Sequence, residues 1–194
     1  MINAIKADDV EKLKELYTGN ILEEEEYAIH IAAQNKSLKC LTFLVDKQLK
    51  SKNGRGQTAL MISCENKFLD GVKLLLGEAG MKDENGQTAL MIAAQSNFLE
   101  AVMLLKAELK QQDGDGFTAL IYAAQENNPE IIKELLEEKN LEDSDGLTAL
   151  ENAIMRGTWE AVRALWKAEG GERATKFAKD EFVADELQKA IEGL

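Results

Sequence analysis

Residues 86–95 read Gly-Gln-Thr-Ala-Leu-Met-Ile-Ala-Ala-Gln, and the pattern of this stretch recurs along the chain. Related blocks, each with Thr-Ala-Leu two residues after a glycine, begin at Gly56, Gly116 and Gly146. Consecutive blocks are 30 residues apart. A period of this length is typical of a solenoid, in which one supersecondary unit is stacked on the next. The sequence therefore predicts a repeat array rather than a protein with one central core.

The composition favours an all-α protein. The 194 residues include 1 Pro, 14 Gly and 6% aromatic residues, and 45% are hydrophobic. These values suit helices that pack through Ala and Leu. The net charge of −12 opposes binding to nucleic acid or to anionic membranes, because both require neutralising Lys and Arg.

The sequence also predicts a cytoplasmic location. Cys40 and Cys64 fall at helical positions in different repeats and form no C-x-x-C pair, so we expect reduced, buried thiols. The stretch Met1 to Asp8 lacks the long apolar region of a signal peptide. No run approaches the ~18 apolar residues of a membrane helix.

Each block predicts two helices and a turn. A threonine (Thr58, Thr88 or Thr118) precedes the apolar periodicity, where an N-cap belongs. A polar break follows at 66–67, 96–97 and 127–128, and leucine and valine at three-residue spacing then mark a second helix. Pro129 stands where the first residue of a helix is expected. The glycine that opens each block fits a turn that requires positive φ.

The repeat boundaries follow from this period. We expect an N-terminal cap at 1–24, repeats at 25–55, 56–85, 86–115, 116–145 and 146–173, and a C-terminal capping helix at 174–194, with Phe177 and Phe182 covering the last repeat. The first repeat is the least regular, because Glu25 replaces the glycine, Tyr27 replaces the threonine and its interval is 31 residues. The acidic run Glu23–Glu26 fits either a solvated helix start or an acidic docking patch.

The repeated block resembles the ankyrin repeat, whose signature is G-x-T-P-L-H-x-A-A with an Asp three residues before the glycine. Asp83, Asp113 and Asp143 hold that position, and Asn53 replaces the Asp once. The resemblance implies antiparallel helix pairs and turn fingers in a curved array that binds proteins. Short units of this Ala-Leu-Met type are similar to ankyrin arrays of flagellate protists, which occur alone or fused to NEK-type kinase domains.

The sequence departs from the ankyrin signature in three ways. Alanine replaces its proline in every full repeat, and the histidine survives only as His30. At the other histidine positions stand Met61, Met91, Ile121 and Glu151. The period of 30 residues is shorter than the usual ~33, so we expect short fingers.

No residue of the chain is predicted to be catalytic, cofactor-binding or metal-binding. His30 is the only histidine and is expected to be structural. The D-x-D-G runs at 113–116 and 143–146 have glycine at the fourth position, whereas a calcium loop needs it at the sixth, so they are interpreted as turns. Trp159 and Trp166 fit either packing at the end of the array or contacts to a partner.

We expect a monomeric, non-catalytic protein-binding module or scaffold that uses no cofactor. The alternatives are an enzyme or small-ligand-binding protein on the same frame, or a structural spacer. The resemblance places recognition beside each glycine and at the end of each first helix. The candidate residues are Arg55, Gln57, Glu84, Gln87, Gln95, Asp115, Phe117, Gln125, Glu126, Asp145, Leu147 and Met155, together with Glu26, Gln34, Asn35, Glu65, Asn66, Ser96 and Arg156. Because Phe117 and Leu147 replace glutamines beside acidic residues, we expect a partner segment with an apolar anchor and basic flanks.

Overall fold

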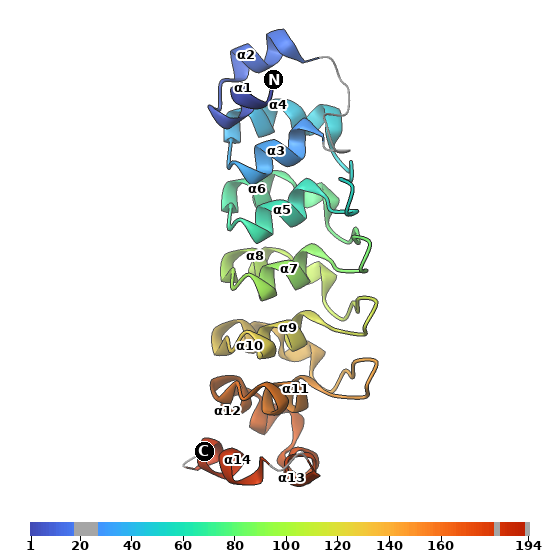
Figure 1. Ribbon diagram of the computed structural model, residues 1–194, viewed down its shortest axis with the longest axis vertical. Helices are drawn as coiled ribbons and strands as arrows, with labels where there is room; N and C mark the ends of the chain where they lie inside the picture. The colour runs from blue at the N-terminus through green and yellow to red at the C-terminus, as the bar shows by residue number, and fades with distance from the viewer. Residues whose placement is uncertain (18–26, 181–182, 193–194) are drawn as a thin grey trace. The chain divides into compact units, whose positions relative to one another are not determined.

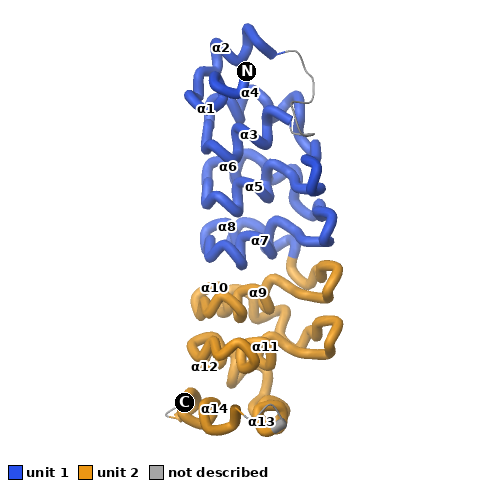
Figure 2. The backbone as a smooth tube through the Cα atoms, in the orientation of Figure 1, with its two compact units in different colours: residues 1–108 blue, residues 109–194 orange. Residues whose placement is uncertain are grey.

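The computed structural model describes residues 1–17, 27–180 and 183–192, and all regular elements in these ranges are helices (Figure 1). The all-α fold is therefore confirmed. The chain divides into two compact units, Met1–Glu108 and Leu109–Leu194 (Figure 2). Within the described ranges, none of the helices combines the length and apolarity needed to span a bilayer. Glu23–Glu26 and Phe182 lie outside the described residues, so the predictions about them stay open.

Unit 1 stacks helix pairs in two layers (Figure 1). The first helices of the pairs, α1, α3, α5 and α7, form one layer, and the second helices, α2, α4, α6 and α8, form the other. The elements are α1 (Ile2–Lys6), α2 (Val10–Leu16), α3 (Ala28–Gln34), α4 (Leu38–Gln48), α5 (Ala59–Glu65), α6 (Leu69–Leu74), α7 (Ala89–Gln95) and α8 (Leu99–Leu104), with 3-10 turns η2 (Leu76–Glu78) and η3 (Lys106–Glu108).

Unit 2 repeats this arrangement and ends in two further helices. Its elements are α9 (Ala119–Gln125), α10 (Pro129–Leu135), the 3-10 turn η4 (Leu136–Glu138), α11 (Ala149–Arg156), α12 (Trp159–Glu169), α13 (Gly171–Asp180) and α14 (Ala184–Ile191). Helix α9 packs on α11 and α10 packs on α12, while α13 contacts α11 and α14 contacts α12. The tail thus contains two helices, where the apolar pattern had indicated one.

The core of each unit lies between its two helix layers. In the repeat that contains α5 and α6, Leu60, Val72 and Leu75 are fully buried, and the equivalent residues of the other full repeats are buried as well. Burying one such side chain stabilises the fold by about 1.5–3 kcal/mol. Ala93 and Ala94 in the middle of α7 are also buried, and their small size lets neighbouring helices approach closely.

The first helices begin where the sequence predicts. In four repeats the threonine hydroxyl accepts a hydrogen bond from the backbone N–H three residues later, at 3.3–3.5 Å. These threonines are Thr58, Thr88, Thr118 and Thr148. Asn128 likewise caps α10 by accepting from the N–H groups of Glu130 and Ile131, with Pro129 at the first helical position. The N-cap predictions are therefore confirmed.

At the position of the family histidine, four repeats have a side chain that accepts a backbone N–H. In the first full repeat, His30 Nδ1 accepts from the backbone N–H of Tyr27 at 3.3 Å, and its Nε2 lies 3.1 Å from the carbonyl oxygen of Ser51. This pair of contacts fits a neutral imidazole, and burial lowers the His30 pKa. In the next two repeats the thioethers of Met61 and Met91 accept from the backbone N–H groups of Thr58 and Thr88, the equivalents of Tyr27, at 3.4 and 3.5 Å. His30 is structural, as predicted.

The difference in length between the first repeat and its successors has a local cause in the second helices. Helix α4 continues to Gln48, four residues after the core residue Leu44. In the following repeats the α-helix ends early and a tighter 3-10 turn follows, so that Glu78 comes only three residues after the core residue Leu75. The first repeat is therefore one residue longer than its successors.

Candidate functional site

The fingers, at residues 51–57, 81–87, 111–117 and 141–147, are fixed by the side chain at their third residue. In the first finger, Asn53 Oδ1 accepts from the backbone N–H groups of Arg55 at 3.0 Å and Gln57 at 2.9 Å. Asp83, Asp113 and Asp143 make the same two hydrogen bonds in the other fingers. Because these carboxylate oxygens hold backbone N–H groups, the interpretation of the D-x-D-G runs as turns is supported.

Neighbouring fingers within each unit contact one another closely. The N–H of Glu84 donates to the Arg55 carbonyl at 3.3 Å in unit 1, and the N–H of Ser144 donates to the Asp115 carbonyl at 2.9 Å in unit 2. Gly56 has a φ of +72°, and a Cβ there would lie 2.8 Å from the nitrogen of Glu84. Glycine is therefore required both by the conformation and by the space. The result in each unit is a pair of finger tips joined by a backbone hydrogen bond.

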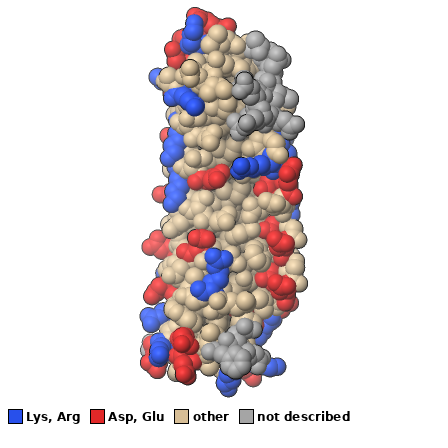
Figure 3. Space-filling view, viewed as in Figure 1, with Lys and Arg blue, Asp and Glu red and all other residues tan. Residues whose placement is uncertain are grey.

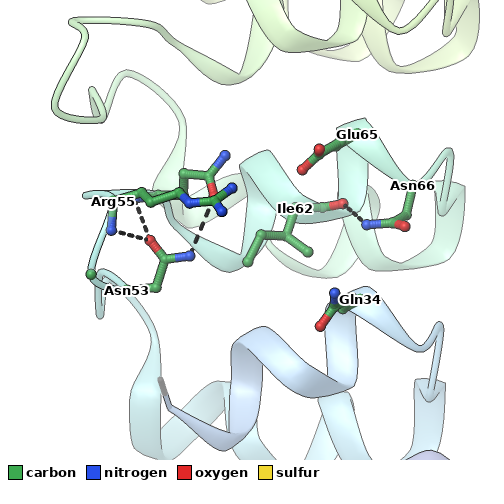
Figure 4. Close-up of a pocket in the computed structure, with 8 residues that line it drawn as sticks. Gln34, Asn53, Arg55, Ile62, Glu65 and Asn66 are labelled. Atoms are coloured by element: carbon green, nitrogen blue, oxygen red, sulfur yellow. Dashed lines mark hydrogen bonds between the residues drawn. The ribbon is translucent and has the colours of Figure 1, made fainter. Parts of the chain in front are cut away.

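Unit 1 has a polar hollow of about 300 Å³ between its finger 51–57 and the ends of its first helices (Figure 4). Ile62 of α5, which is 6% exposed, contributes the apolar part of the lining. The remaining lining residues are Gln34, Asn53, Gly54, Arg55, Gln57, Glu65 and Asn66. The structure thus brings Arg55 and Gln57 together with three of the candidates at helix ends. Glu84, Gln87 and Gln95 belong to the same unit but do not line the hollow.

The hollow carries one cation and one anion. Arg55 comes from the finger and Glu65 from the last residue of α5, and both side chains are exposed. Among the described residues, neither forms an ion pair within 4.0 Å. The Asn66 amide donates to the Ile62 carbonyl at 2.9 Å, which holds this side chain at the end of α5 (Figure 4).

The apolar candidates of unit 2 are only partly exposed. The Phe117 ring packs edge-on against Tyr122, with ring centroids 5.6 Å apart. The Tyr122 hydroxyl in turn donates to Asp113 Oδ2 at 2.6 Å. Leu147 is half-buried at the equivalent position of the next finger, where Asn152 donates to Asp143 Oδ2 at 2.7 Å. Each finger of unit 2 is therefore tied to a first helix through its aspartate, a link that the sequence analysis missed.

The other candidate residues of unit 2 differ in whether neighbouring side chains hold them by hydrogen bonds. The Gln125 amide donates to Asn152 Oδ1 at 3.1 Å, and its oxygen accepts from Arg156 at 3.2 Å. Gln125 is thus held by its neighbours, whereas Met155 is 57% exposed. Asp115, Glu126 and Asp145 are also exposed. Figure 3 shows acidic atoms gathered along the finger edge of unit 2.

A second set of residues that the sequence analysis missed is a series of buried glutamates. Glu78 accepts from the N–H of Lys50 at 2.9 Å with one oxygen and from the N–H of Leu60 at 2.8 Å with the other. Glu108 and Glu138 make the same two contacts in their repeats. These glutamates recur every 30 residues, and this regular spacing in the sequence could have identified them.

The described residues offer little for covalent or metal chemistry. Burial raises the pKa of the Cys40 thiol to about 11 and raises that of Cys64 as well, so both remain protonated and unreactive at neutral pH. Within the described ranges, no three His, Cys, Asp or Glu side chains are placed to hold a metal ion. What the surface can do is present rigid polar and half-buried apolar groups to a partner.

Comparison with known proteins identifies the repeat. A family model for ankyrin repeats, built from three copies, matches residues 1–82, 69–141 and 103–180. No curated protein matches the chain. Among solved structures, the ankyrin repeat domain of Bcl-3, a member of the IkappaB protein family, superposes with a TM-score of 0.78, at 20% identity over 96% of each chain. An ankyrin repeat domain from Acinetobacter baumannii AYE gives a TM-score of 0.74 at 23% identity, over 86% of this chain and 96% of its own.

Proposed function

Because the chain belongs to the ankyrin-repeat family, whose members are generally protein-interaction modules, we propose that it is a non-catalytic scaffold that binds a segment of a partner protein. The observation that carries this proposal is the pair of hydrogen-bonded fingers in each unit, with exposed side chains beside the ends of the first helices. A surface that is already ordered before binding loses little conformational entropy when a partner docks.

The partner segment that unit 2 would bind has an apolar anchor and basic flanks. Phe117 and Leu147 offer half-buried apolar contacts, and Asp115, Glu126 and Asp145 stand exposed around them. Aromatic anchors in partly desolvated positions carry much of the energy of protein interfaces. Exposed carboxylates mainly steer the encounter and select the charge of the partner.

We also propose that the chain acts as a monomer in the cytoplasm, without a cofactor and without binding nucleic acid or membranes. The net charge of −12 supports the last two points, because phosphate-rich surfaces repel an acidic protein. The two buried, protonated thiols suit a reducing compartment. Light scattering on the purified chain would test the monomeric state.

The matched test of the unit 2 surface replaces Phe117 and Leu147 by Gln, the residue that Gln57 and Gln87 hold at the same position in unit 1. A photo-crosslinking residue placed at 117 in the source cell would first identify the bound protein. We expect each substitution to weaken its affinity by roughly 5- to 30-fold, the range for an interface anchor.

Lys133→Gln on α10 provides the control, because Lys133 is exposed on a second helix, away from the fingers. Its affinity should equal that of the wild type. Unchanged affinity in both the Phe117 and the Leu147 variants, with circular dichroism showing an intact fold, would mean that the binding surface lies elsewhere.

A further inference from the structure

The hollow of unit 1 differs from the equivalent positions of the other repeats in the charges that it carries. The residue before the finger glycine is Arg55 here, whereas Asn85, Asp115 and Asp145 hold that position elsewhere. The last residue of the first helix is Glu65 here and Gln34, Gln95 or Gln125 in other repeats. A basic and an acidic residue, each found once at its repeat position, therefore lie on the same hollow.

The two charged residues of the hollow belong to different elements. Arg55 belongs to a finger whose backbone is locked by Asn53, and Asn53 Nδ2 also lies 3.3 Å from Gln57 Oε1 (Figure 4). Glu65 ends a helix whose first turn is fixed by the Thr58 cap. Both charged groups thus lie on backbone that is held by hydrogen bonds, and the space that they line is partly open to solvent.

A structural explanation for the two charges is weak. A direct Arg55–Glu65 ion pair is not formed within 4.0 Å, and an exposed pair of this kind contributes only about 0–1 kcal/mol to stability. Arg presents a planar fork of donors that matches a carboxylate, and a Glu accepts from a Lys or Arg side chain. The Gln34 amide and the NH₂ group of Gln57 also line the hollow and can meet the main chain of a ligand.

We propose that this hollow binds a partner segment in which an acidic side chain stands next to a basic one, with the acid on Arg55 and the base on Glu65. The hollow, at about 300 Å³, lies at the small end of ligand pockets, which suits one or two side chains rather than a whole cofactor. This inference rests on the proposed function, because it assumes that the partner docks as a segment. It adds a charge pattern that the surface of unit 2 does not select.

The test is a selection of random 12-residue displayed peptides against the full chain, run in parallel with Arg55→Gln, Glu65→Gln and the control Lys52→Gln. Glutamine is the residue that other repeats carry at position 65, and Lys52 is an exposed finger residue that donates to the Lys82 carbonyl and does not line the hollow. For wild type and control we expect enrichment of Asp or Glu beside Lys or Arg. Arg55→Gln should lose the acidic preference and Glu65→Gln the basic one.

One selected peptide is then measured by isothermal titration and by NMR. Each single substitution should weaken it roughly tenfold, as loss of a charged hydrogen bond does. The charge-exchanged double variant Arg55→Glu/Glu65→Arg should prefer the peptide with its two charged residues exchanged. The side-chain amide signals of Gln34 and Asn66 should shift on binding.

The outcomes separate this inference from the proposed function. Peptides that bind without the charge pattern, or equally well to both Gln variants, overturn the inference and leave segment binding intact. If neither wild type nor any variant selects a peptide, both the inference and the proposed segment binding are overturned.

Discussion

Glu138 shows how a single buried side chain can join two consecutive repeats. One carboxylate oxygen accepts from the N–H of Lys110 and the other from the N–H of Leu120, each at 2.8 Å. A carboxylate is suited to this position because both of its oxygens accept hydrogen bonds.

Glu138→Gln tests this role without a change of size. The amide has one accepting oxygen, and its NH₂ group would face a backbone N–H that also needs an acceptor. We expect the free energy of unfolding to fall by about 1–3 kcal/mol, the cost of a buried polar group left unpaired, in urea melts. Glu137→Gln, next to it and exposed, is the control and should leave the stability unchanged.

The same variant gives a pH dependence of defined sign. Burial raises the pKa of Glu138 above its usual 4.5 in the folded state, although hydrogen bonds from Lys110 and Leu120 oppose this. The folded state then binds the proton more tightly than the unfolded state, so this group favours folding most below pH 4.5 and loses that contribution as the pH rises through the folded pKa. The advantage of the wild type over Glu138→Gln should shrink across that window. An advantage that grows with pH would show that the hydrogen bonds outweigh burial.

At the residue level, hydrogen bonds between residues close in the sequence could be predicted, whereas those between distant residues could not. Thr88 could be recognised as an N-cap because the N–H that it binds lies three residues later. Glu108 binds N–H groups 18 and 28 residues earlier, so only the array itself brings them together. Its charge resembled that of the many solvated glutamates, and only its 30-residue recurrence distinguished it.

Among the elements, α13 shows how the last repeat is closed. Arg173 on α13 donates to Glu151 of α11 at 2.8 and 2.9 Å, to Glu142 at 2.5 Å and to the Gly146 carbonyl at 2.7 Å. The Glu151 side chain is only 4% exposed, whereas Arg173 is 52% exposed. One arginine therefore fixes this helix to the first helix and the finger of the repeat before it.

Arg173→Met keeps most of the aliphatic chain and removes the guanidinium. Because a nearly buried carboxylate loses its charged donor, we expect a loss of about 1–3 kcal/mol and faster hydrogen exchange in α13. Lys176→Met, an exposed change on the same helix, should alter neither quantity. Restored protection in α13 in the double variant Arg173→Met/Glu151→Gln would confirm that the unpaired Glu151 causes the loss. Equal exchange rates in wild type and Arg173→Met would contradict the proposed clamp.

The helices of the repeats were predictable from the sequence, whereas the apolar pattern indicated one helix in the tail and the structure contains two. In the repeats, capping residues and three-residue apolar spacing gave the start of each helix. In the tail, Ala174, Ala178, Leu187 and Ala190 are buried, but they belong to two helices that cover different neighbours, α11 and α12. An apolar pattern indicates which side of a helix is buried, but it does not show where one helix ends and the next begins. Gly171 permits the close approach, because a Cβ there would lie 2.5 Å from the Trp166 ring, so the packing interpretation of Trp166 is supported.

For the whole molecule, the repeat period was enough to predict the fold class, whereas the grouping of side chains on the candidate surface could be seen only in the structure. Fingers and first helices follow from a signature that is complete in the repeats beginning at Gly56, Gly86, Gly116 and Gly146. The hollow depends on Arg55 and Glu65, which are separated by ten positions and belong to different elements. Phe117 was expected to offer an apolar side chain to the partner, but it also packs against the Tyr122 ring. We therefore expect the residues that differ between repeats, rather than the repeated signature, to determine which partner is bound.

A deletion of residues 171–194 tests how far stability extends along the chain. It removes α13 and α14, whose contacts with α11 and α12 help to cover Leu150, Val162 and Leu165. In a repeat protein each repeat is stabilised mainly by its immediate neighbours, so the loss of stability should be greatest in α11 and α12. We expect faster hydrogen exchange there, concentration-dependent association in light scattering and unchanged protection in α3, α5 and α7. Deleting only 184–194 is the control: it should destabilise α12 but leave α11 protected, because Arg173 remains. Loss of protection throughout unit 1 in the longer deletion would mean that the chain folds as one cooperative body and that the tail is more than a terminal cap.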